Sequence, residues 1–353
     1  MDKKIIEKLL QVAVCAPSGE NCQPWEFTVT GMTIRARIPQ STDNALYGWG
    51  QRASVIAHGA LLENIRIAAP SFGLRTEYAR ILEENTGTTF TVTLQPGETR
   101  QDPLFSSIEQ RTSNRKPYKK IPLTTLERRE LLAGNNQISG ATLRLAEQPE
   151  QIAKLATCGG INEKILFSNQ KLHTFFFEHI NWNKEADAKK STGFYLKTLE
   201  LPPPARLLFP LIRYWPVLKI LNFIGFSKMI ALGNAKLYAT APTFGSITIP
   251  NASKESYFEA GRLLQRTWLL ITKQGLFLQP LTGALFLYLK LQAGETEHFS
   301  KSQIMEVAET HTTIQKTFSV PPSETIAMLF RIGHADPPSA KASRLTPHIE
   351  YLS

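Results

Sequence analysis

The residues whose types fit ligand binding gather in a few short loops, and the first loop lies near the start of the chain. Residues 15–27 read CAPSGENCQPWEF, where proline and glycine interrupt two apolar stretches. Ser18, Asn21 and Gln23 supply a hydroxyl and two amides, groups that both donate and accept hydrogen bonds. Binding residues concentrate on such irregular loops. The alternative interpretation is a helix stop whose polar side chains only cap the backbone.

The second loop, residues 111–118, reads RTSNRKPY and places two arginines four positions apart. Guanidinium groups bind phosphate oxygens through paired hydrogen bonds, and a nearby hydroxyl adds a donor. Arg111, Ser113 and Arg115 therefore form a candidate phosphate site. The competing interpretation is a solvated basic segment ahead of a capped helix that begins near Thr124.

The third group of candidates joins a turn to the C-terminal tail. Residues 275–283, GLFLQPLTG, predict a helix end followed by a Thr-Gly turn with free backbone N–H groups. A short strand is expected over 328–332, before an extended basic tail. The candidate residues in this group are Pro280, Thr282, Gly283, Lys341 and Arg344. The sequence contains no P-loop, GxGxxG, HExxH or GxSxG motif, so nucleotide, zinc and serine-hydrolase sites lack their usual signatures.

Composition narrows the class of protein. The 353 residues are 42% apolar and 20% charged, which is typical of a folded chain. The net charge is +10, but the basic residues are scattered, and no basic helix or zinc-finger spacing indicates a nucleic-acid partner. Cys15, Cys22 and Cys158 form no CxxC pair, so we expect a reducing, cytoplasmic location and no metal site. Residues 1–14 predict an amphipathic helix rather than a secretory signal.

Hydrophobic periodicity divides the chain into two parts. The elements expected in the first part are a helix around 5–13, a hairpin over 25–38 that turns at Gly31, a helix over 52–69 and a strand over 88–96. The polar segment 96–103, bracketed by prolines, is the best linker.

Two of the predicted helices share an internal similarity. Residues 59–74 and 261–276 align without a gap and share five identities in sixteen positions. Helices that end in Gly-Leu are common. The similarity alone therefore leaves a duplicated half-structure and a coincidence equally open.

Together these segments resemble the FMN-dependent nitroreductase superfamily. Residues 16–27 are similar to its Ala-Pro-Ser-x-x-Asn-x-Gln-Pro-Trp segment, and residues 108–132 to its Arg-x-Ser-x-Arg phosphate motif and the helix that follows. Residues 275–283 are similar to its flavin-edge turn, and residues 328–344 to its closing strand and basic tail. The resemblance implies an α+β chain with a three-layer α-β-α fold.

The order of these motifs departs from that of ordinary members. There the phosphate motif precedes the Pro-Ser-x-x-Asn segment, whereas here it follows. This order resembles the single-chain, Acg-like branch, in which two fused halves imitate the usual homodimer. The resemblance implies two tandem halves, 1–100 and 104–353, that form an internal pseudodimer with one flavin site in each chain. A monomer then suffices for the site, and further oligomerisation stays open.

The resemblance also assigns roles to the candidate residues. Those that would hold the FMN phosphate are Arg111, Ser113, Arg115, Lys341 and Arg344. Those that would approach the flavin from the first half are Pro17, Ser18 and Asn21, with Gln23 either joining them or only bracing the loop. Those near the reactive edge of the flavin are Pro280, Thr282 and Gly283. No side chain is assigned as an acid or base, and His58 and Cys22 are expected to pack.

These roles predict an FMN oxidoreductase that transfers two electrons to a small planar acceptor, of nitroaromatic or quinone type. Thr282 stands where many nitroreductases carry Glu, which leaves NAD(P)H open as the electron donor. The alternative is a protein that binds and sequesters flavin without nicotinamide-dependent activity.

Residues 194–233 are apolar and aromatic but are broken by prolines and basic residues, which argues against an uninterrupted membrane span. Three explanations compete for this segment: a lid over the flavin, a segment that contacts a membrane surface, and a dimerisation surface. The resemblance favours the lid, because single-chain members carry an insertion here that covers the active site.

Overall fold

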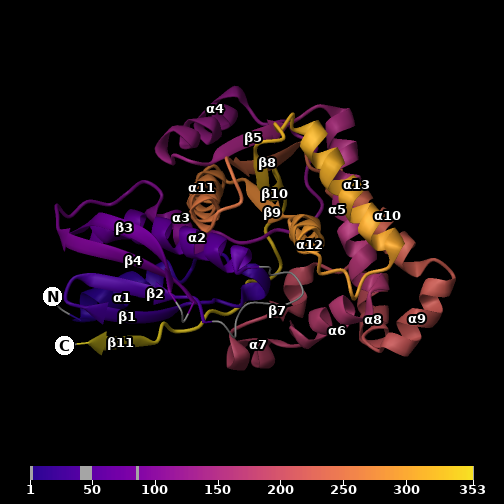
Figure 1. The fold of residues 1–353 in the computed structure, drawn as a ribbon, viewed down its shortest axis with the longest axis horizontal. Coiled ribbons are helices and arrows are strands. Elements are labelled where there is room, and N and C mark those ends of the chain that lie inside the picture. Colours follow the sequence, from indigo (N-terminus) through magenta and orange to yellow (C-terminus); the bar gives the residue numbers. More distant parts are fainter. Residues whose placement is uncertain (1–2, 40–49, 85–86, 353) are drawn as a thin grey trace.

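The computed structural model describes residues 3–39, 50–84 and 87–352, and it contains a main sheet in each predicted half (Figure 1). The elements of the first half are α1 (Lys3–Ala13), η1 (Gly19–Asn21), β1 (Glu26–Thr30), β2 (Thr33–Arg37), α2 (Arg52–Ala68), η3 (Ala69–Phe72), β3 (Leu74–Glu84) and β4 (Gly87–Pro96). The first sheet has the strand order β11-β1-β2-β4-β3. Its edge strand β11 (Ile349–Leu352) pairs in parallel with β1, so the end of the second half completes the sheet of the first.

The second half is richer in helices. Its elements up to residue 200 are α3 (Phe105–Gln110), α4 (Thr125–Ala133), η4 (Gly134–Gln137), β5 (Thr142–Ala146), α5 (Pro149–Ser168), α6 (Gln170–Glu178), β6 (Ile180–Asn181), α7 (Lys184–Lys190), β7 (Phe194–Tyr195) and η5 (Leu196–Leu199). Those that follow are α8 (Pro203–Ile212), α9 (Trp215–Phe223), α10 (Phe226–Tyr238), β8 (Thr243–Ile249), α11 (Lys254–Lys273), β9 (Phe277–Pro280), α12 (Gly283–Gln292), α13 (Lys301–Thr317) and β10 (Thr325–Gly333). The second sheet is antiparallel, with the order β5-β8-β10-β9.

Helices cover both faces of the second sheet. Successive side chains of a strand point to opposite faces. On β10, Phe330 and Ile332 join the core cluster that contains α11, whereas Leu329 joins the cluster that contains residues of α5 and α12. The predicted α+β class, with sheet between helical layers, is confirmed.

Helices α2 and α11 pack against each other between the two sheets, and they carry the sequence similarity noted above. A Cβ atom on Gly59 would lie 2.0 Å from the carbonyl oxygen of Phe258, and one on Gly261 would lie 2.0 Å from that of Ile56. The two contacts are reciprocal, because Phe258 lies three positions before Gly261 and Ile56 lies three positions before Gly59. Only glycine allows the backbones to come this close.

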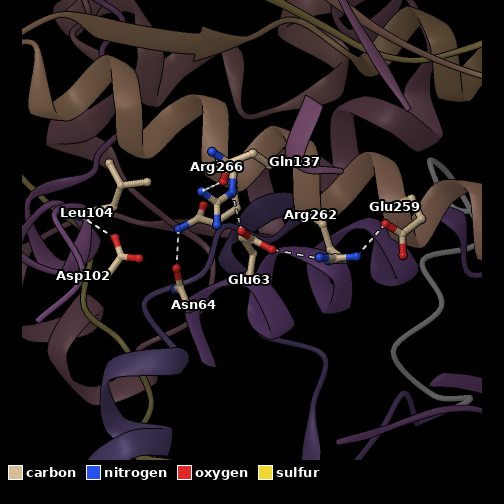
Figure 2. A network of polar contacts seen from close by, with 9 residues as sticks. Glu63, Asn64, Asp102, Leu104, Gln137, Glu259, Arg262 and Arg266 are labelled. Carbon is tan, nitrogen blue, oxygen red and sulfur yellow. Dashed lines mark hydrogen bonds and ion pairs between the residues drawn. The ribbon is translucent and has the colours of Figure 1, made fainter. Parts of the chain in front are cut away.

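Polar contacts beside this crossing also join the two helices (Figure 2). Arg266 Nε donates to Glu63 Oε1 at 2.6 Å, and Gln265 Nε2 donates to Asn64 Oδ1 at 2.6 Å. The Glu63 side chain is fully buried, and Arg262 Nε, 3.3 Å from Oε2, gives it a second cation. A buried carboxylate is tolerated when it is paired in this way. One hydrophobic core cluster also contains residues of both predicted halves, so the core runs across the predicted boundary between them.

Several sequence predictions are confirmed, but most of the described strands were missed. The hairpin of β1 and β2 turns at Gly31, whose φ is +59°, and both α2 and β4 lie where they were expected. Residues 97–103 connect β4 to α3 without helix or strand. The strands that the sequence did not reveal are β3, β5, β6, β7, β8, β9 and β11.

Substitution at the helix crossing tests how tightly the halves are joined. Gly59→Ala or Gly261→Ala should lower the free energy of unfolding by about 3 kcal/mol, because the added methyl group meets a backbone oxygen that cannot move alone. Urea unfolding followed by circular dichroism measures the change.

Gly233→Ala is the matched control. Gly233 lies inside the helix α10 with nothing within 4 Å of its Cβ position, so alanine there should leave stability unchanged or raise it by about 0.5–1 kcal/mol. Equal changes in the free energy of unfolding for Gly59→Ala and Gly233→Ala would contradict the close approach of α2 and α11.

Candidate functional site

A cavity of about 920 Å³ lies between the two halves, and α2 and α11 form part of its wall. This volume is in the range of small-molecule sites, about 300–1,000 Å³. The predicted site residues that line the cavity are Pro17, Ser18, Asn21, Arg111, Ser113, Arg115, Pro280, Thr282, Gly283, Lys341 and Arg344. The structure thus brings together loops that lie more than three hundred residues apart in the sequence.

The first loop has a strained backbone. Glu20, Asn21 and Gln23 have φ angles of 45°, 56° and 51°, in the left-handed region that residues other than glycine rarely adopt. Gln23 does not line the cavity but braces the loop, since its Nε2 donates to Ser191 O at 2.6 Å and Leu345 N donates to its Oε1 at 3.0 Å. Strain of this kind persists only when the surroundings fix it.

Asn21 joins the first loop to the basic tail. Its Nδ2 donates to Ser343 O at 3.0 Å, and Arg344 Nη1 donates to its Oδ1 at 2.7 Å. Asp187 holds this part of the tail, because its Oδ2 accepts from Ser343 N at 2.8 Å and from Ser343 Oγ at 2.7 Å. Two patches that the sequence suggested separately are therefore in direct contact within one chain.

Arg111 is a buried cation that has no carboxylate partner in the part of the chain that the structure describes. Its side chain crosses to the first half, where Nη2 donates to Cys15 O at 2.9 Å, and its guanidinium lies 4.5 Å from the Trp268 ring centroid. Its Nε has no hydrogen-bond partner in the described chain. Burial, and then the charge of Arg344, lower the pKa of Arg111 to about 9. An anion in the cavity would give the unpartnered Nε an acceptor, and it would offset the free-energy cost of burying the charge beside Arg344.

Lys341 and Arg344 add to this cationic cluster. Lys341 Nζ donates to the backbone oxygen of Glu109. Burial lowers the pKa of Lys341, and the charges of Arg111 and Arg344 lower it further. Burial also lowers the pKa of Arg344. Among the described residues, none of the three cations forms an ion pair with a carboxylate.

Arg115 has different surroundings from Arg111. Its Nη1 donates to Thr198 O at 3.1 Å, and its guanidinium lies 5.6 Å from the Phe194 ring centroid. Its charged neighbours include Glu163 and the rim residue Glu200. The two arginines that the sequence analysis had placed on one phosphate thus have different hydrogen-bond partners, and Arg115 contacts the 194–233 segment.

The 111–118 loop and the 275–283 turn lie side by side. Ser113 forms a parallel bridge with Leu278, and Asn114 N donates to Leu278 O at 3.1 Å. The buried Arg331 donates to Lys116 O at 2.8 Å and to Gln279 Oε1 at 2.8 Å, which fixes both segments.

In the turn, the hydroxyl of Thr282 is already used as a donor inside the protein. Thr282 Oγ1 donates to Leu329 O at 3.3 Å, so toward the cavity its oxygen has only lone pairs to offer. A Cβ atom on Gly283 would lie 2.3 Å from Asn162 Oδ1, so glycine lets the turn approach α5.

Sequence analysis missed a buried acid on α5. Tyr238 Oη donates to Glu163 Oε1 at 3.2 Å, both residues line the cavity, and burial raises the pKa of each. The sequence feature that could have drawn attention to this part of α5 is the Gly159–Gly160 pair inside a helical pattern. A Cβ atom on Gly160 would lie 2.5 Å from Ala231 O, so the pair lets α10 pack closely on α5.

His58 and Cys22 fit their expected packing roles. The His58 ring contacts Trp25 and Phe90, and burial lowers its pKa to about 4. Cys22 lines the cavity, but burial raises the pKa of its thiol to about 12, so it carries little thiolate at neutral pH.

The apolar segment 194–233 forms one wall of the cavity. Leu208 and Phe209 of α8 and Met229 and Ile230 of α10 line it. The site thus has a cationic end, made by Arg111 and the tail, and an apolar wall.

No family model matches the chain, but it is similar to several known proteins. It is 24% identical over 353 residues to the uncharacterized protein MT1398 of Mycobacterium tuberculosis, covering 97% of this chain and 47% of that protein. The chain thus spans about half the length of this relative. It is 21% identical over 291 residues to the probable NAD(P)H nitroreductase PigM of a Serratia species, covering 79% of this chain and 80% of that protein.

Solved structures overlap the chain in part. An NADPH:FMN oxidoreductase from Vibrio harveyi, complexed with NAD+, is 10% identical with a TM-score of 0.37, over 69% of this chain and 74% of that one. A nitroreductase with bound FMN from Desulfitobacterium hafniense is 11% identical with a TM-score of 0.36, over 70% of this chain and 95% of that one.

The strained loop supplies a prediction about pH. Burial raises the pKa of Glu20 from 4.5 to about 7, so between these values the folded chain holds a proton that the unfolded chain releases. Stability must therefore fall as the pH rises through this window. Glu20→Gln removes the charge. The gain in the free energy of unfolding of this variant over the wild type should be absent at acidic pH and fully present above neutral pH.

Urea unfolding of both chains across this pH range measures the difference. Glu98→Gln, at an exposed glutamate after β4, is the control and should keep the wild-type pH profile. A Glu20→Gln gain that stays constant with pH would show that the carboxyl is not held in its neutral form.

Proposed function

We propose that the cavity binds FMN, with the phosphate held by Arg111, Lys341 and Arg344. The observation that carries this proposal is the cluster of these three cations at one end of a cavity with an apolar wall. Arg111 is buried, Arg344 half-buried and Lys341 exposed, and none of them forms an ion pair with a carboxylate among the described residues. Arg111 Nε, buried and unpartnered, is a donor that fits a phosphate oxygen.

The remaining predicted residues fit the rest of the cofactor. Ser113 and the backbone of the turn at Pro280, Thr282 and Gly283 line the cavity beside the phosphate-motif loop. Arg115 would then act on the ring side of the cofactor rather than on its phosphate. When bound, FMN supplies the electron transfer, while the protein's own residues orient it and limit the access of water.

We infer a flavin-dependent oxidoreductase that reduces a small planar acceptor of nitroaromatic or quinone type. The similarity to PigM, named a probable NAD(P)H nitroreductase, supports this class and makes NAD(P)H the first donor to test. The apolar wall formed by α8 and α10 favours an uncharged acceptor, because it offers few hydrogen-bonding groups. We assign the α8–α10 segment as a lid over the flavin.

We further propose that the two halves form an internal pseudodimer, so that each chain carries one complete site. The reciprocal glycine contacts of α2 and α11 support this arrangement. The site contacts between halves support it too, since Arg111 donates to Cys15 O and Arg344 to Asn21 within one chain.

The phosphate assignment is tested by comparing FMN with riboflavin, which lacks the phosphate. Arg111→Ala should weaken FMN binding by about ten- to a hundredfold, since a charge-assisted hydrogen bond contributes about 1.5–3 kcal/mol. Riboflavin affinity should stay nearly unchanged. Quenching of flavin fluorescence measures both affinities.

Arg115→Ala is the matched control, because this arginine contacts the 194–233 segment instead. It should change FMN and riboflavin affinity by similar factors. Equal losses of both ligands in Arg111→Ala would mean that this arginine supports the fold rather than the phosphate.

Mixing two defective chains tests where the site is assembled. A chain with Asn21→Ala and a chain with Arg111→Ala each lack one side of the site. If sites formed between chains, co-refolding would restore some intact sites. An intramolecular site gives no rescue at any mixing ratio, measured as tight FMN binding, and recovery of that binding would overturn the pseudodimer.

Anaerobic mixing with NADH or NADPH separates reduction from sequestration. Rapid bleaching of the bound flavin is expected for the oxidoreductase. The second candidate function is flavin sequestration. Two observations favour it: α8 and α10 form a wall over the cavity, and the Thr282 hydroxyl already donates to Leu329 O. Sequestration predicts tight FMN binding with no bleaching by either nucleotide over hours.

A further inference from the structure

The outward sides of α8, α9 and α10 expose large apolar side chains. Phe223 is 96% exposed, Ile224 82% and Leu207 81%. The exposed apolar residues of these helices, called here the apolar face, are Leu207, Leu208, Leu211, Tyr214, Val217, Ile220, Phe223, Ile224, Met229 and Leu232. Contiguous exposed apolar surface of this kind marks an interaction site.

The inner sides of the same helices are already used. Phe209, Ile212 and Leu218 are buried in the core cluster that also contains residues of α5 and α6. A lid over the cavity accounts for these inner contacts but leaves the outer side unexplained. Figure 1 shows α9 at the end of the molecule opposite β1 and β11, where another body could reach it.

The charge on this segment has a single sign. No acidic residue occurs between Glu200 and Glu255. The exposed charged residues of α8, α9, α10 and their connections are Arg206, Arg213, Lys219, Lys228 and Lys236. None of these pairs with a carboxylate among the described residues; Arg206 Nε donates to Leu201 O at 2.7 Å, and Arg213 contacts the rings of Trp182 and Tyr214.

We propose that the apolar face docks on an anionic lipid surface. Short helices with apolar side chains and flanking Lys and Arg lie in the membrane interface, where the cations meet acidic headgroups. No single helix in the described ranges is long and apolar enough to cross a bilayer; α9 and α10 reach that length only as a pair bent by 85°. The geometry therefore fits contact with the surface.

Charge argues against a second copy of this chain as the occupant. A two-fold interface through the apolar face would bring the same set of cations on both copies together, without acidic partners in the segment. A surface of acidic headgroups neutralises them instead.

The apolar face also borders the cavity. Leu208 and Met229 are 44% and 60% exposed, and both line the cavity. Docking would place this side of the cavity against lipid, so an apolar acceptor dissolved in the bilayer could enter without crossing water. The docking itself does not depend on flavin binding or on the proposed reaction.

Flotation with vesicles tests the docking. Wild-type chain should float with vesicles that contain phosphatidylglycerol and stay behind with pure phosphatidylcholine, and added salt should weaken the binding. Phe223→Ser with Ile224→Ser should lower the partition coefficient by about tenfold or more. Both positions are exposed, so the fold should persist, and circular dichroism checks it.

Two control variants separate this site from general stickiness. Ile121→Ser with Leu126→Ser removes apolar side chains that are 49% and 53% exposed in and just before α4, away from the apolar face. It should float like the wild type. Lys219→Gln with Lys228→Gln should reduce flotation, whereas Lys8→Gln with Lys120→Gln should not.

Three outcomes would overturn the proposal. The first is no flotation with phosphatidylglycerol. The second is equal flotation with both kinds of vesicle, or equal flotation of the Phe223→Ser, Ile224→Ser variant and the wild type. The third is a concentration-dependent dimer in sedimentation that this variant abolishes while vesicles bind neither chain, which would assign the face to a second copy.

Discussion

The contact of α2 with α11 at Gly59 and Gly261 is the constraint on which the site depends. It sets the distance between the halves, because each glycine faces a carbonyl oxygen of the other helix. Buried Glu63, held by Arg262 and Arg266, then fixes the rotation of one helix against the other (Figure 2). Residues of both helices line the cavity, so its shape follows from how closely they cross.

This crossing gives the cationic end of the cavity its chemistry. Arg111, from the second half, reaches a carbonyl of the first, and the tail returns across the first half to bring Lys341 and Arg344 beside it. The tail stays there because Asp187 holds Ser343 and because β11 pairs with β1. Three neighbouring cations, of which Arg111 is buried, are unfavourable without an anion, and a bound phosphate would supply one.

The sequence was informative where residue type alone limits the structure. Pro17 and Gly31 mark turns whatever the fold, and both lie where expected. The RTSNR loop lines the cavity through Arg111, Ser113 and Arg115. Strands β9 and β11 were missed because their pairing partners are distant in the sequence, so no local pattern predicts them. Glu163 was missed because a buried acid on a helix looks, in sequence, like a solvated one. The different surroundings of Arg111 and Arg115 come from tertiary contacts with the tail and with residues 194–199.

The central claim is that one chain holds one FMN in the cavity between its halves. The most direct measurement is a titration of the purified chain with FMN, following the visible flavin absorbance and the mass of the complex together. The account predicts saturation at one FMN per chain on a species with the mass of a monomer. A chain that stays colourless and binds no added FMN would contradict it.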